Sequence, residues 1–237
     1  TKLFIIFKTS DMNSVLLFQI EKVYSGTILK RPSQYCKSPY VADVLLDNNE
    51  IIAHSPSLGC CGLAEKDSNV IMSKIEKKSK QKSVCEYKIE LAIHKEKDEE
   101  MIIGINPKLG ETIAEHALNK NCICGLTNIK TYQREIKVLN SRFDFAGIDS
   151  EGVHFIMEIK NVPLADYIDV PKKERKKYIN SIINKSFNEK ISYFPDGYRK
   201  NSTDVVSPRA LKHIQELEKI AKEKNIRTIL CFIIQRT

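Results

Sequence analysis

Two carboxylates and a lysine stand in an otherwise apolar stretch of the sequence. The stretch reads SRFDFAGIDSEGVHFIMEIKN and spans residues 141–161, with Asp144, Glu158 and Lys160 among phenylalanine, isoleucine and methionine residues. A pair of carboxylates is a suitable ligand set for Mg²⁺, a hard cation that takes oxygen ligands from side chains and water. The bound cation polarises a phosphoryl oxygen and lowers the pKa of a coordinated water, so these residue types point to metal-assisted phosphodiester hydrolysis.

The alternation of apolar and polar residues predicts a β-hairpin in which the two carboxylates meet. A three-residue loop at 150–152, with Gly152 in the left-handed conformation, sets Asp144 opposite Glu158. A slip of one residue would scatter the aromatic side chains over both faces, so the apolar pattern favours this register. In it, one face carries the aromatic and aliphatic residues Phe143, Phe145, Phe155, Met157 and Ile159.

Directly opposed carboxylates repel each other, so something must offset their charge. A divalent cation between them is one solution. The other is purely structural, with Lys160 and Arg142, which face each other in the same register, forming a surface ion network with the two acids. Lys160 shares the face of Glu158, where it could orient the attacking water or stabilise developing negative charge. The hairpin alone leaves both interpretations open.

The N-terminal third of the chain reads as short strands of a small β-barrel or sandwich. Its apolar or alternating runs are cut by turn clusters such as DNN, SLG and KDSN. A further run at 85–95 either closes this unit or opens the next one. The predicted strands cover residues 15–20, 23–31, 40–46, 50–56 and 69–75.

The rest of the chain mixes helices and strands in the order αβββαβ. Helical spacing predicts a helix at 108–121, and a strand at 132–139 precedes the hairpin. A second helix follows at 207–225, with Ser207 as N-cap and Pro208 in the first helical position. The closing apolar run, RTILCFIIQ, predicts a strand buried on both faces. The apolar stripe expected on the second helix is Leu211, Ile214, Leu217 and Ile220 or Ala221.

Composition favours an anionic partner. The 237 residues carry a net charge of +8, which makes nucleic acid the first candidate, although the lysine clusters at 74–82 and 172–177 also fit a solvated surface. We expect no transmembrane helix, because no apolar run is long enough. The opening TKLFIIFKT lacks the features of a signal peptide, and the seven cysteines are irregularly spaced. We therefore predict an intracellular protein of the cytoplasm, nucleus or nucleoid, not secreted, with reduced thiols and no zinc site.

Longer motifs resemble a known family. GTILKRPSQYCKSPYVADVLLDNNEIIAHSPSLGCCGL, GINPKLGETIAEHAL, NSRFDF, MEIKNVPLA, YFPDGY and LKHIQEL follow in the order found in the sugar fermentation stimulation protein A family. The similarity spans residues 27–235, and the Asp and Glu-x-Lys pattern within the αβββαβ order resembles the PD-(D/E)xK nuclease superfamily. The resemblance implies an α+β or α/β protein. It also implies an OB-fold-like barrel at 1–88 that would bind nucleic acid and a restriction-endonuclease-like domain at 89–237.

The same resemblance implies a DNA- or RNA-binding protein with a metal-dependent nuclease site. Its catalytic residues would be Asp144, Glu158 and Lys160. Mg²⁺, or Mn²⁺ in its place, would be held by Asp144, Glu158 and Glu115, although Glu115 also fits a solvent-facing position on its helix. The alternatives are a non-catalytic DNA-binding regulatory protein that retains the nuclease fold, and a structural protein with an ion network. We expect no sugar-metabolising activity.

Nucleic-acid contacts are predicted in the barrel and beside the hairpin. Aromatic residues that stack on bases and cations that contact phosphates are the expected types. Tyrosines in a β-rich unit also serve in packing, so both roles stay open for them. The candidates are Tyr24, Lys30, Arg31, Tyr35, Lys37, Tyr40 and Arg142.

Some segments depart from the family pattern. HSPSLGCC at 54–61 replaces an Asn-rich stretch, so His54 fits a structural hydrogen bond as well as a ligand contact. The insertion at 166–190 is longer than in the family. Asp196 is either a supporting acid or a turn residue, and His213 either reaches a phosphate or lies on the surface of its helix.

Overall fold

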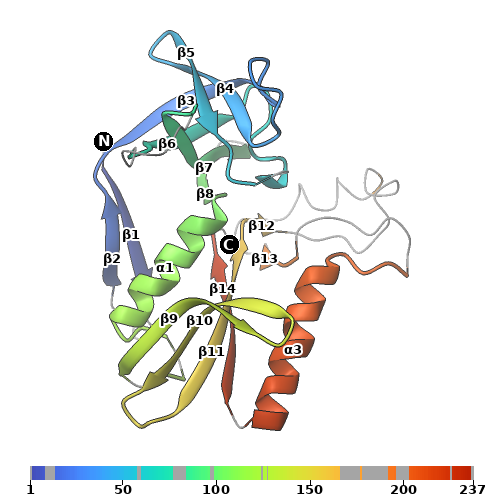
Figure 1. The fold of residues 1–237 in the computed structure, drawn as a ribbon. Coiled ribbons are helices and arrows are strands. Elements are labelled where there is room, and N and C mark those ends of the chain that lie inside the picture. The colour runs from blue at the N-terminus through green and yellow to red at the C-terminus, as the bar shows by residue number, and fades with distance from the viewer. Residues whose placement is uncertain are drawn as a thin grey trace. The chain divides into compact units, whose positions relative to one another are not determined.

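The computed structural model of the chain describes residues 2–8, 14–57, 60–76, 84–96, 99–123, 125–126, 128–165, 177, 192–195, 203–224 and 226–235. The chain folds into two compact units, one extending to Ile113 and the other from Ala114 to Gln235 (Figure 1). Within the described ranges, no helix has both the length and the apolar character needed to cross a membrane.

The first unit consists of strands and a short 3-10 helix. They are β1 Leu3–Lys8, β2 Ser14–Ile20, β3 Val23–Lys30, β4 Val41–Leu46, β5 Asn49–His54, η1 Cys60–Gly62, β6 Asn69–Lys74, β7 Tyr87–Glu96 and β8 Glu99–Gly104. The main sheet has the order β5-β4-β3-β6-β7-β8, and a parallel pairing of Ala53 with Tyr87 also joins β5 to β7. That pairing closes β3, β4, β5, β7 and β6 into a ring, the barrel alternative of the sequence prediction.

Apolar residues from every strand of this ring fill its interior. Ile28, Val44, Ala53, Met72 and Ile89 are all fully buried there. A second apolar cluster joins the β1–β2 hairpin to β6, β7 and the first turns of helix α1 (Pro107–Asn119), through Leu3, Phe18, Ile71, Leu91 and Leu109. The first unit therefore has a core of its own, as expected of an independent barrel.

The strand predictions for the first unit are confirmed, since all of them are present as β2 to β6. The run at 85–95 forms β7, so it closes the barrel. β1 and β8 have no counterpart in the sequence prediction. The predicted domain boundary between residues 88 and 89 falls inside β7, whereas the two compact units divide within α1.

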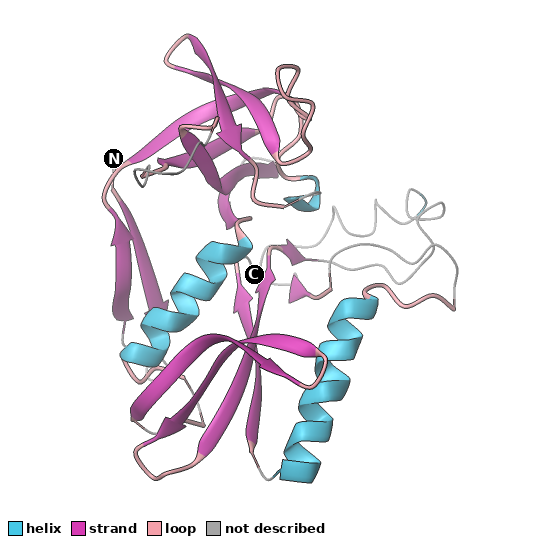
Figure 2. Ribbon diagram, viewed as in Figure 1, coloured by secondary structure: helices cyan, strands magenta, loops and turns pink. Residues whose placement is uncertain are grey.

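The second unit is a four-stranded sheet between helices (Figure 2). After α1 come β9 Ile129–Val138, β10 Ser141–Asp149, β11 His154–Val162, the short β12 Leu164–Ala165 and β13 Ser192–Tyr193, α3 Pro208–Lys224 and β14 Arg227–Ile234. The predicted order αβββαβ is confirmed. β10 pairs antiparallel with β9 and β11, and β14 runs parallel to β11. A parallel pair requires a crossover connection, which α3 supplies.

The two helices cover opposite faces of this sheet. Ala114 and Leu118 of α1 pack against a cluster that contains Phe145, Phe155, Met157 and Ile159. Leu217 and Ile220 of α3 pack against Phe143 and Ile156. Because successive residues of a strand point to opposite faces, Glu158 and Lys160 lie on the same side of β11 as Ile156, which is the α3 side.

The predicted hairpin register is confirmed near the loop and interrupted farther from it. Phe145 pairs with Met157, and Gly152 has a φ of 82° in the loop. Phe143 does not lie on the face of Phe145, as was predicted, but packs in the α3 cluster, so that assignment is wrong. On the neighbouring strand, Glu135 has a φ of 56°, a conformation that non-glycine residues rarely adopt. The alternation of β10 changes face at this irregular point of the β9–β10 ladder.

Helix α3 begins as predicted but buries a different stripe. The Oγ of Ser207 accepts a hydrogen bond from the N–H of Ala210 at 3.3 Å, as an N-cap does. Leu211 and Ile214, which were predicted to be buried, are 39% and 41% exposed. That part of the prediction is wrong, because the helix is rotated about its axis. The buried residues are Ala210, His213, Leu217 and Ile220.

Strand β14 is covered along only part of its length. Among the strands that the structure describes, it pairs with β11 alone and so lies at the edge of the sheet. Its residue Leu230 belongs to the α3 cluster, whereas Phe232 and Ile234 on the same side are 45% and 55% exposed. The prediction of burial on both faces is therefore wrong for the end of this strand.

Candidate functional site

Glu158 is a buried carboxylate at the centre of the α3 side of the sheet. It is 4% exposed. Its Oε1 accepts a close hydrogen bond from the Nζ of Lys160 and lies 2.6 Å from the Nδ1 of His213. Its Oε2 is also buried, and among the described residues it has no hydrogen-bond partner. A buried carboxylate oxygen without a partner is costly, so Glu158 keeps one oxygen available at an energetic expense.

The side chain of Asp144 contacts the backbone of β11 next to Glu158. The backbone pairing of β10 with β11 extends as far as Phe145 and Met157. Beyond that pair, the Oδ2 of Asp144 accepts a hydrogen bond from the backbone N–H of Ile159 at 2.7 Å. This contact attaches Asp144 to the residue that follows Glu158 on β11, whereas the predicted pairing of Asp144 with Glu158 is not among the described β10–β11 pairs.

Lys160 is partly buried beside the same carboxylate. Its side chain is 12% exposed, and its Nζ forms an ion pair with the Oε1 of Glu158. The ammonium group also lies 5.9 Å from the ring centre of Phe194, a distance compatible with a cation–π contact. Both contacts fix the direction of a side chain that otherwise has many rotamers, so its charge is held at the site.

His213 is the site residue that sequence reasoning placed wrongly. The alternative that it lies on the surface of its helix is wrong, because it is 5% exposed. Its ring packs 5.8 Å from that of Phe143, and its Nδ1 meets Glu158. The signal was present in the sequence, because His213 stands three residues after Ala210 and four before Leu217, on one helical stripe.

Glu115 makes contacts on β9. Its Oε2 lies 2.7 Å from the Nη1 of Arg134, and its Oε1 accepts a hydrogen bond from the hydroxyl of Tyr132 at 3.2 Å. The described part of the chain contains no group of three or more histidine, cysteine, aspartate or glutamate side chains arranged to hold a metal ion. The proposal that Glu115 is a metal ligand stays a prediction.

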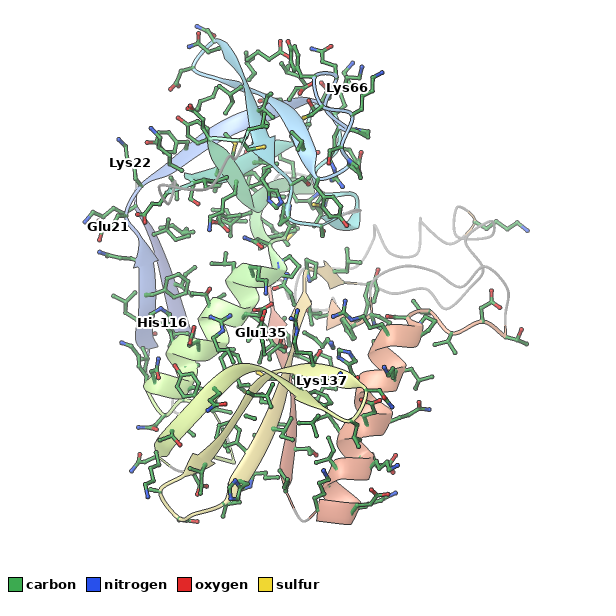
Figure 3. The ribbon with its side chains drawn as sticks, in the orientation of Figure 1. Glu21, Lys22, Lys66, His116, Glu135 and Lys137 are labelled. Carbon is green, nitrogen blue, oxygen red and sulfur yellow. The ribbon has the colours of Figure 1, made fainter. Side chains whose placement is uncertain are left out.

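Arg142 lies at the exposed end of β10. It is opposite Lys137 in the β9 register, and its Nη1 is 3.6 Å from the Oε2 of Glu135. Figure 3 labels Glu135 and Lys137 on β9. The predicted surface network of Arg142 with Lys160 and the two acids is not among its contacts in the described residues. Arg142 instead lines a pocket together with the basic residues Arg209 and Lys212 of α3.

The aromatic and basic candidates of the barrel divide into exposed and structural residues. Tyr35 and Tyr40 are 62% and 43% exposed, and Lys30 and Lys37 are exposed as well. Tyr24 contacts Tyr87 edge to face at 5.1 Å between ring centres and joins the barrel core, so it is a packing residue. The exposed residues lie in β3 and in the loop between β3 and β4.

Arg31 has a structural role in the barrel. Its side chain is 4% exposed. The guanidinium donates hydrogen bonds to the backbone carbonyls of Pro39 at 3.3 Å, Ala64 at 3.1 Å and Ser57 at 3.1 Å. An arginine whose donors are used in this way holds loops together, so we leave Arg31 out of the nucleic-acid surface proposed below.

Of the remaining candidates, His54 belongs to the barrel of the first unit, and Asp196 lies outside the described residues. His54 ends β5 in the barrel, and partial desolvation, with the positive charge of Lys88, lowers its pKa against a smaller opposite effect of Glu90. Asp196 and the insertion at 166–190, apart from residue 177, fall outside the described residues.

Comparison with known proteins identifies relatives for both the sequence and the fold. A sequence model of the sugar fermentation stimulation protein RE domain matches residues 108–237, more than half of the chain. A sugar fermentation stimulation protein homologue of Clostridium novyi (strain NT) is 27% identical over 174 residues, which cover 70% of this chain and 69% of the relative. A homologue of Shewanella halifaxensis (strain HAW-EB4) is 26% identical over 220 residues, covering 90% and 75%.

A solved structure has the same fold. The structure of Pyrococcus furiosus SfsA in complex with Ca²⁺ superposes with a TM-score of 0.63 at 17% sequence identity. The match covers 92% of this chain and 74% of that protein. The mixed α+β architecture, with its N-terminal antiparallel sheet and its C-terminal sheet between helices, is therefore shared with that structure.

Proposed function

The chain belongs to the sugar fermentation stimulation protein family, and from this premise we propose that it is a metal-dependent nuclease that cleaves phosphodiester bonds in DNA or RNA. The observation that carries the proposal is the state of Glu158. This carboxylate is buried, is held by Lys160 and His213 through one oxygen, and has a second buried oxygen without a partner. A cation ligand accounts for that second oxygen.

The donor set suits a hard divalent cation. Mg²⁺ keeps several waters and takes one or two protein carboxylates, so a third acidic residue is not required. Glu158 and Asp144 would hold the cation, with the aspartate anchored by the N–H of Ile159. When bound, the cation would polarise a phosphoryl oxygen and lower the pKa of a coordinated water. The Ca²⁺ in the Pyrococcus furiosus relative supports a site for a hard cation of this kind.

The other residues of the site would orient and balance the carboxylates. His213 and Lys160 both contact the Oε1 of Glu158, so they fix the rotamer of the glutamate and leave Oε2 in a defined direction. Lys160 would also stabilise negative charge that develops on a phosphoryl group. His213 would have a positioning role, since its Nδ1 contacts the Oε1 of Glu158.

The barrel would bind the nucleic acid. We propose that it is an OB-fold, because its ring order β3-β4-β5-β7-β6, with a parallel β5–β7 pair, is a closed five-stranded arrangement of the kind that binds oligonucleotides. Tyr35 and Tyr40 offer exposed rings for stacking on bases, and Lys30 and Lys37 offer charges for phosphates. The net charge of +8 supports an anionic partner.

The proposal is tested by cleavage of single- and double-stranded DNA and RNA with Mg²⁺, Mn²⁺ or EDTA. We expect cutting that requires the metal and that is lost in Glu158→Ala and in Lys160→Ala. The matched controls are Glu218→Ala and Lys222→Ala, an exposed acid and base that pair with each other on α3. Binding without cleavage in either metal would contradict the nuclease assignment and favour the DNA-binding regulatory protein.

A further inference from the structure

A cavity of about 430 Å³ lies where the turn between β9 and β10 meets the start of α3. Its walls come from Asn140, Ser141 and Arg142 on one side and from Pro208, Arg209, Lys212 and His213 on the other. We call it the α3 cleft. It lies entirely within the second unit, so its walls belong to one compact body.

The α3 cleft is lined by cations and by no acidic residue. Lys212 uses its ammonium to donate to the backbone carbonyl of Asn140 at 2.8 Å and approaches Glu216 at 3.9 Å. Arg142 meets Glu135 at 3.6 Å, where both side chains are largely exposed. Arg209 has no ion-pair partner among the described residues. The positive charge of the cleft is thus only partly neutralised by neighbouring acids.

Ser141 supplies a second, independent sign of a ligand. It lines the α3 cleft and is 5% exposed. Its hydroxyl is buried and has no hydrogen-bond partner within the part of the chain that the structure describes. A buried hydroxyl normally finds a hydrogen-bond partner, because leaving it without one destabilises the fold. A ligand with acceptor oxygens would satisfy this donor and the neighbouring cations together.

His213 connects the α3 cleft to the candidate metal site. The residue lines the cleft, and its Nδ1 lies 2.6 Å from the Oε1 of Glu158. A polymer with repeated anionic groups could therefore place one group at the carboxylates and a neighbouring group in the cleft. A strand of nucleic acid has this repeat, whereas a single small anion does not.

We propose that the α3 cleft binds a backbone phosphate of the nucleic-acid strand next to the phosphodiester at the Glu158 site. Arg209, Arg142 and Lys212 would contact the phosphate oxygens, and the hydroxyl of Ser141 would donate a hydrogen bond. The contacts read no base, so they position the strand without sequence preference. This inference rests on the proposed function, since it assigns a second contact to the same substrate.

The test measures binding of short DNA and RNA oligonucleotides, single-stranded and double-stranded, by fluorescence anisotropy in EDTA. EDTA removes the divalent cation that cleavage would need, so the assay measures binding alone. The variants are Arg209→Gln with Lys212→Gln, and Ser141→Ala. The matched control is Lys219→Gln with Lys222→Gln, which removes the same charge from an exposed part of the same helix. Thermal unfolding of each variant checks that the fold is intact.

We expect the double cleft variant to bind about tenfold more weakly at low salt, with a salt slope smaller by about 1, since the one phosphate neutralised in the cleft contributes about 0.9 to the slope. Ser141→Ala should weaken binding without changing the slope, and the control should keep both values. Equal losses in the cleft and control variants would overturn the inference, and so would unchanged binding in the double cleft variant.

The two proposals fail in different ways. If binding depends on the cleft but the intact protein never cleaves with Mg²⁺ or Mn²⁺, the nuclease assignment fails and the cleft assignment stands. If cleavage depends on Glu158 but oligonucleotide affinity does not depend on Arg209 and Lys212, only the cleft assignment fails. If the protein binds no oligonucleotide in any arm, both are contradicted.

Discussion

Two buried glutamates, Glu90 in the barrel and Glu158 in the second sheet, are 2% and 4% exposed and are bonded very differently. The Oε1 of Glu90 accepts hydrogen bonds from the Oγ of Ser73 at 2.7 Å and the Nζ of Lys88 at 2.8 Å. Its Oε2 accepts one from the Nδ2 of Asn106 at 2.6 Å. Both oxygens of this carboxylate are therefore satisfied by the protein itself.

Glu158 has the opposite arrangement. Lys160 and His213 share one oxygen, and the other has no partner among the described residues. Folding alone favours the first pattern, because a partly satisfied buried polar group destabilises the native state. Buried polar groups that lack a hydrogen-bond partner are expected mainly at sites that bind ligands. The comparison assigns Glu90 to the stability of the barrel and Glu158 to function.

The largest expected effect is on cleavage, with the same substitution made at both glutamates. Glu158→Gln removes a negative charge from the proposed cation site, so we expect the rate to fall by about 10³-fold or more. Glu90→Gln should leave the rate of the folded protein near that of the parent, in single-turnover cleavage with saturating Mg²⁺. Equal losses in the two variants would break the comparison.

The second effect is on stability, and here Glu90→Gln should have the larger effect of the two variants. Glu90→Gln puts an amide donor against the donor of Asn106 and removes the charge that pairs with Lys88. We expect a loss of about 2–4 kcal/mol in the free energy of unfolding, measured in urea. Glu158→Gln also removes a charge, the one that pairs with Lys160, but a neutral amide costs less than a carboxylate oxygen at the position of Oε2 that has no partner, so we expect a smaller loss of about 1–2 kcal/mol.

The third effect is stabilisation by metal. A cation that binds only the folded protein raises the free energy of unfolding by about 2.7 kcal/mol at a hundredfold excess over its Kd. We expect Mg²⁺ or Mn²⁺ to raise the Tm of the parent protein and of Lys222→Gln. The Tm of Glu158→Gln should not change with metal. A shift of equal size in that variant would show that the cation binds elsewhere.

The fourth effect tests His213 as a positioning residue. His213→Leu removes the contact with the Oε1 of Glu158, so we expect metal affinity to fall by about 10–100-fold, as is usual when a partner of a ligand is lost. His213→Asn keeps a donor near the position of Nδ1 and should restore much of the affinity. If the two variants bind Mn²⁺ alike, His213 only fills space.

The smallest effect is the pH dependence contributed by His54. Its pKa is lowered in the folded barrel, chiefly by desolvation and then by Lys88. The neutral His54 ring therefore makes its full contribution to the free energy of unfolding above the unfolded pKa of about 6.5. That contribution is lost as the pH falls through the lower pKa of the folded protein. Solvent around the ring keeps the change below about 1 kcal/mol. NMR titration of the ring should give a pKa under 6.5, and lower still in Glu90→Gln, because Glu90 opposes the shift.

The order of elements was readable from the sequence because it depends on local patterns. Period-2 runs separated by turn residues indicated the barrel strands, and Ser207 with Pro208 marked the start of α3. The apolar face of the hairpin predicted the register, and that register set Asp144 opposite Glu158. Its register near Phe145 and Met157 agrees with the structure, since a slip would have exposed the core.

The details of the site could not be predicted because they depend on departures from regular geometry. Phe143 changes face where β9 has a left-handed residue at Glu135, and a strict period of two cannot express that. The burial of His213 was not predicted, because the larger residues Leu211 and Ile214 suggested a different buried stripe. The oxygen of Glu158 that lacks a partner is a property of the packed site, so no sequence pattern reports it.

The most direct test of the account is calorimetric titration of Mn²⁺ into the parent protein, Glu158→Gln and Glu90→Gln, with no nucleic acid present. We predict a saturable site in the parent and in Glu90→Gln, lost or weakened by at least about tenfold in Glu158→Gln. Equal Mn²⁺ binding by the parent protein and Glu158→Gln would contradict the central claim that the unsatisfied oxygen of Glu158 is a metal ligand.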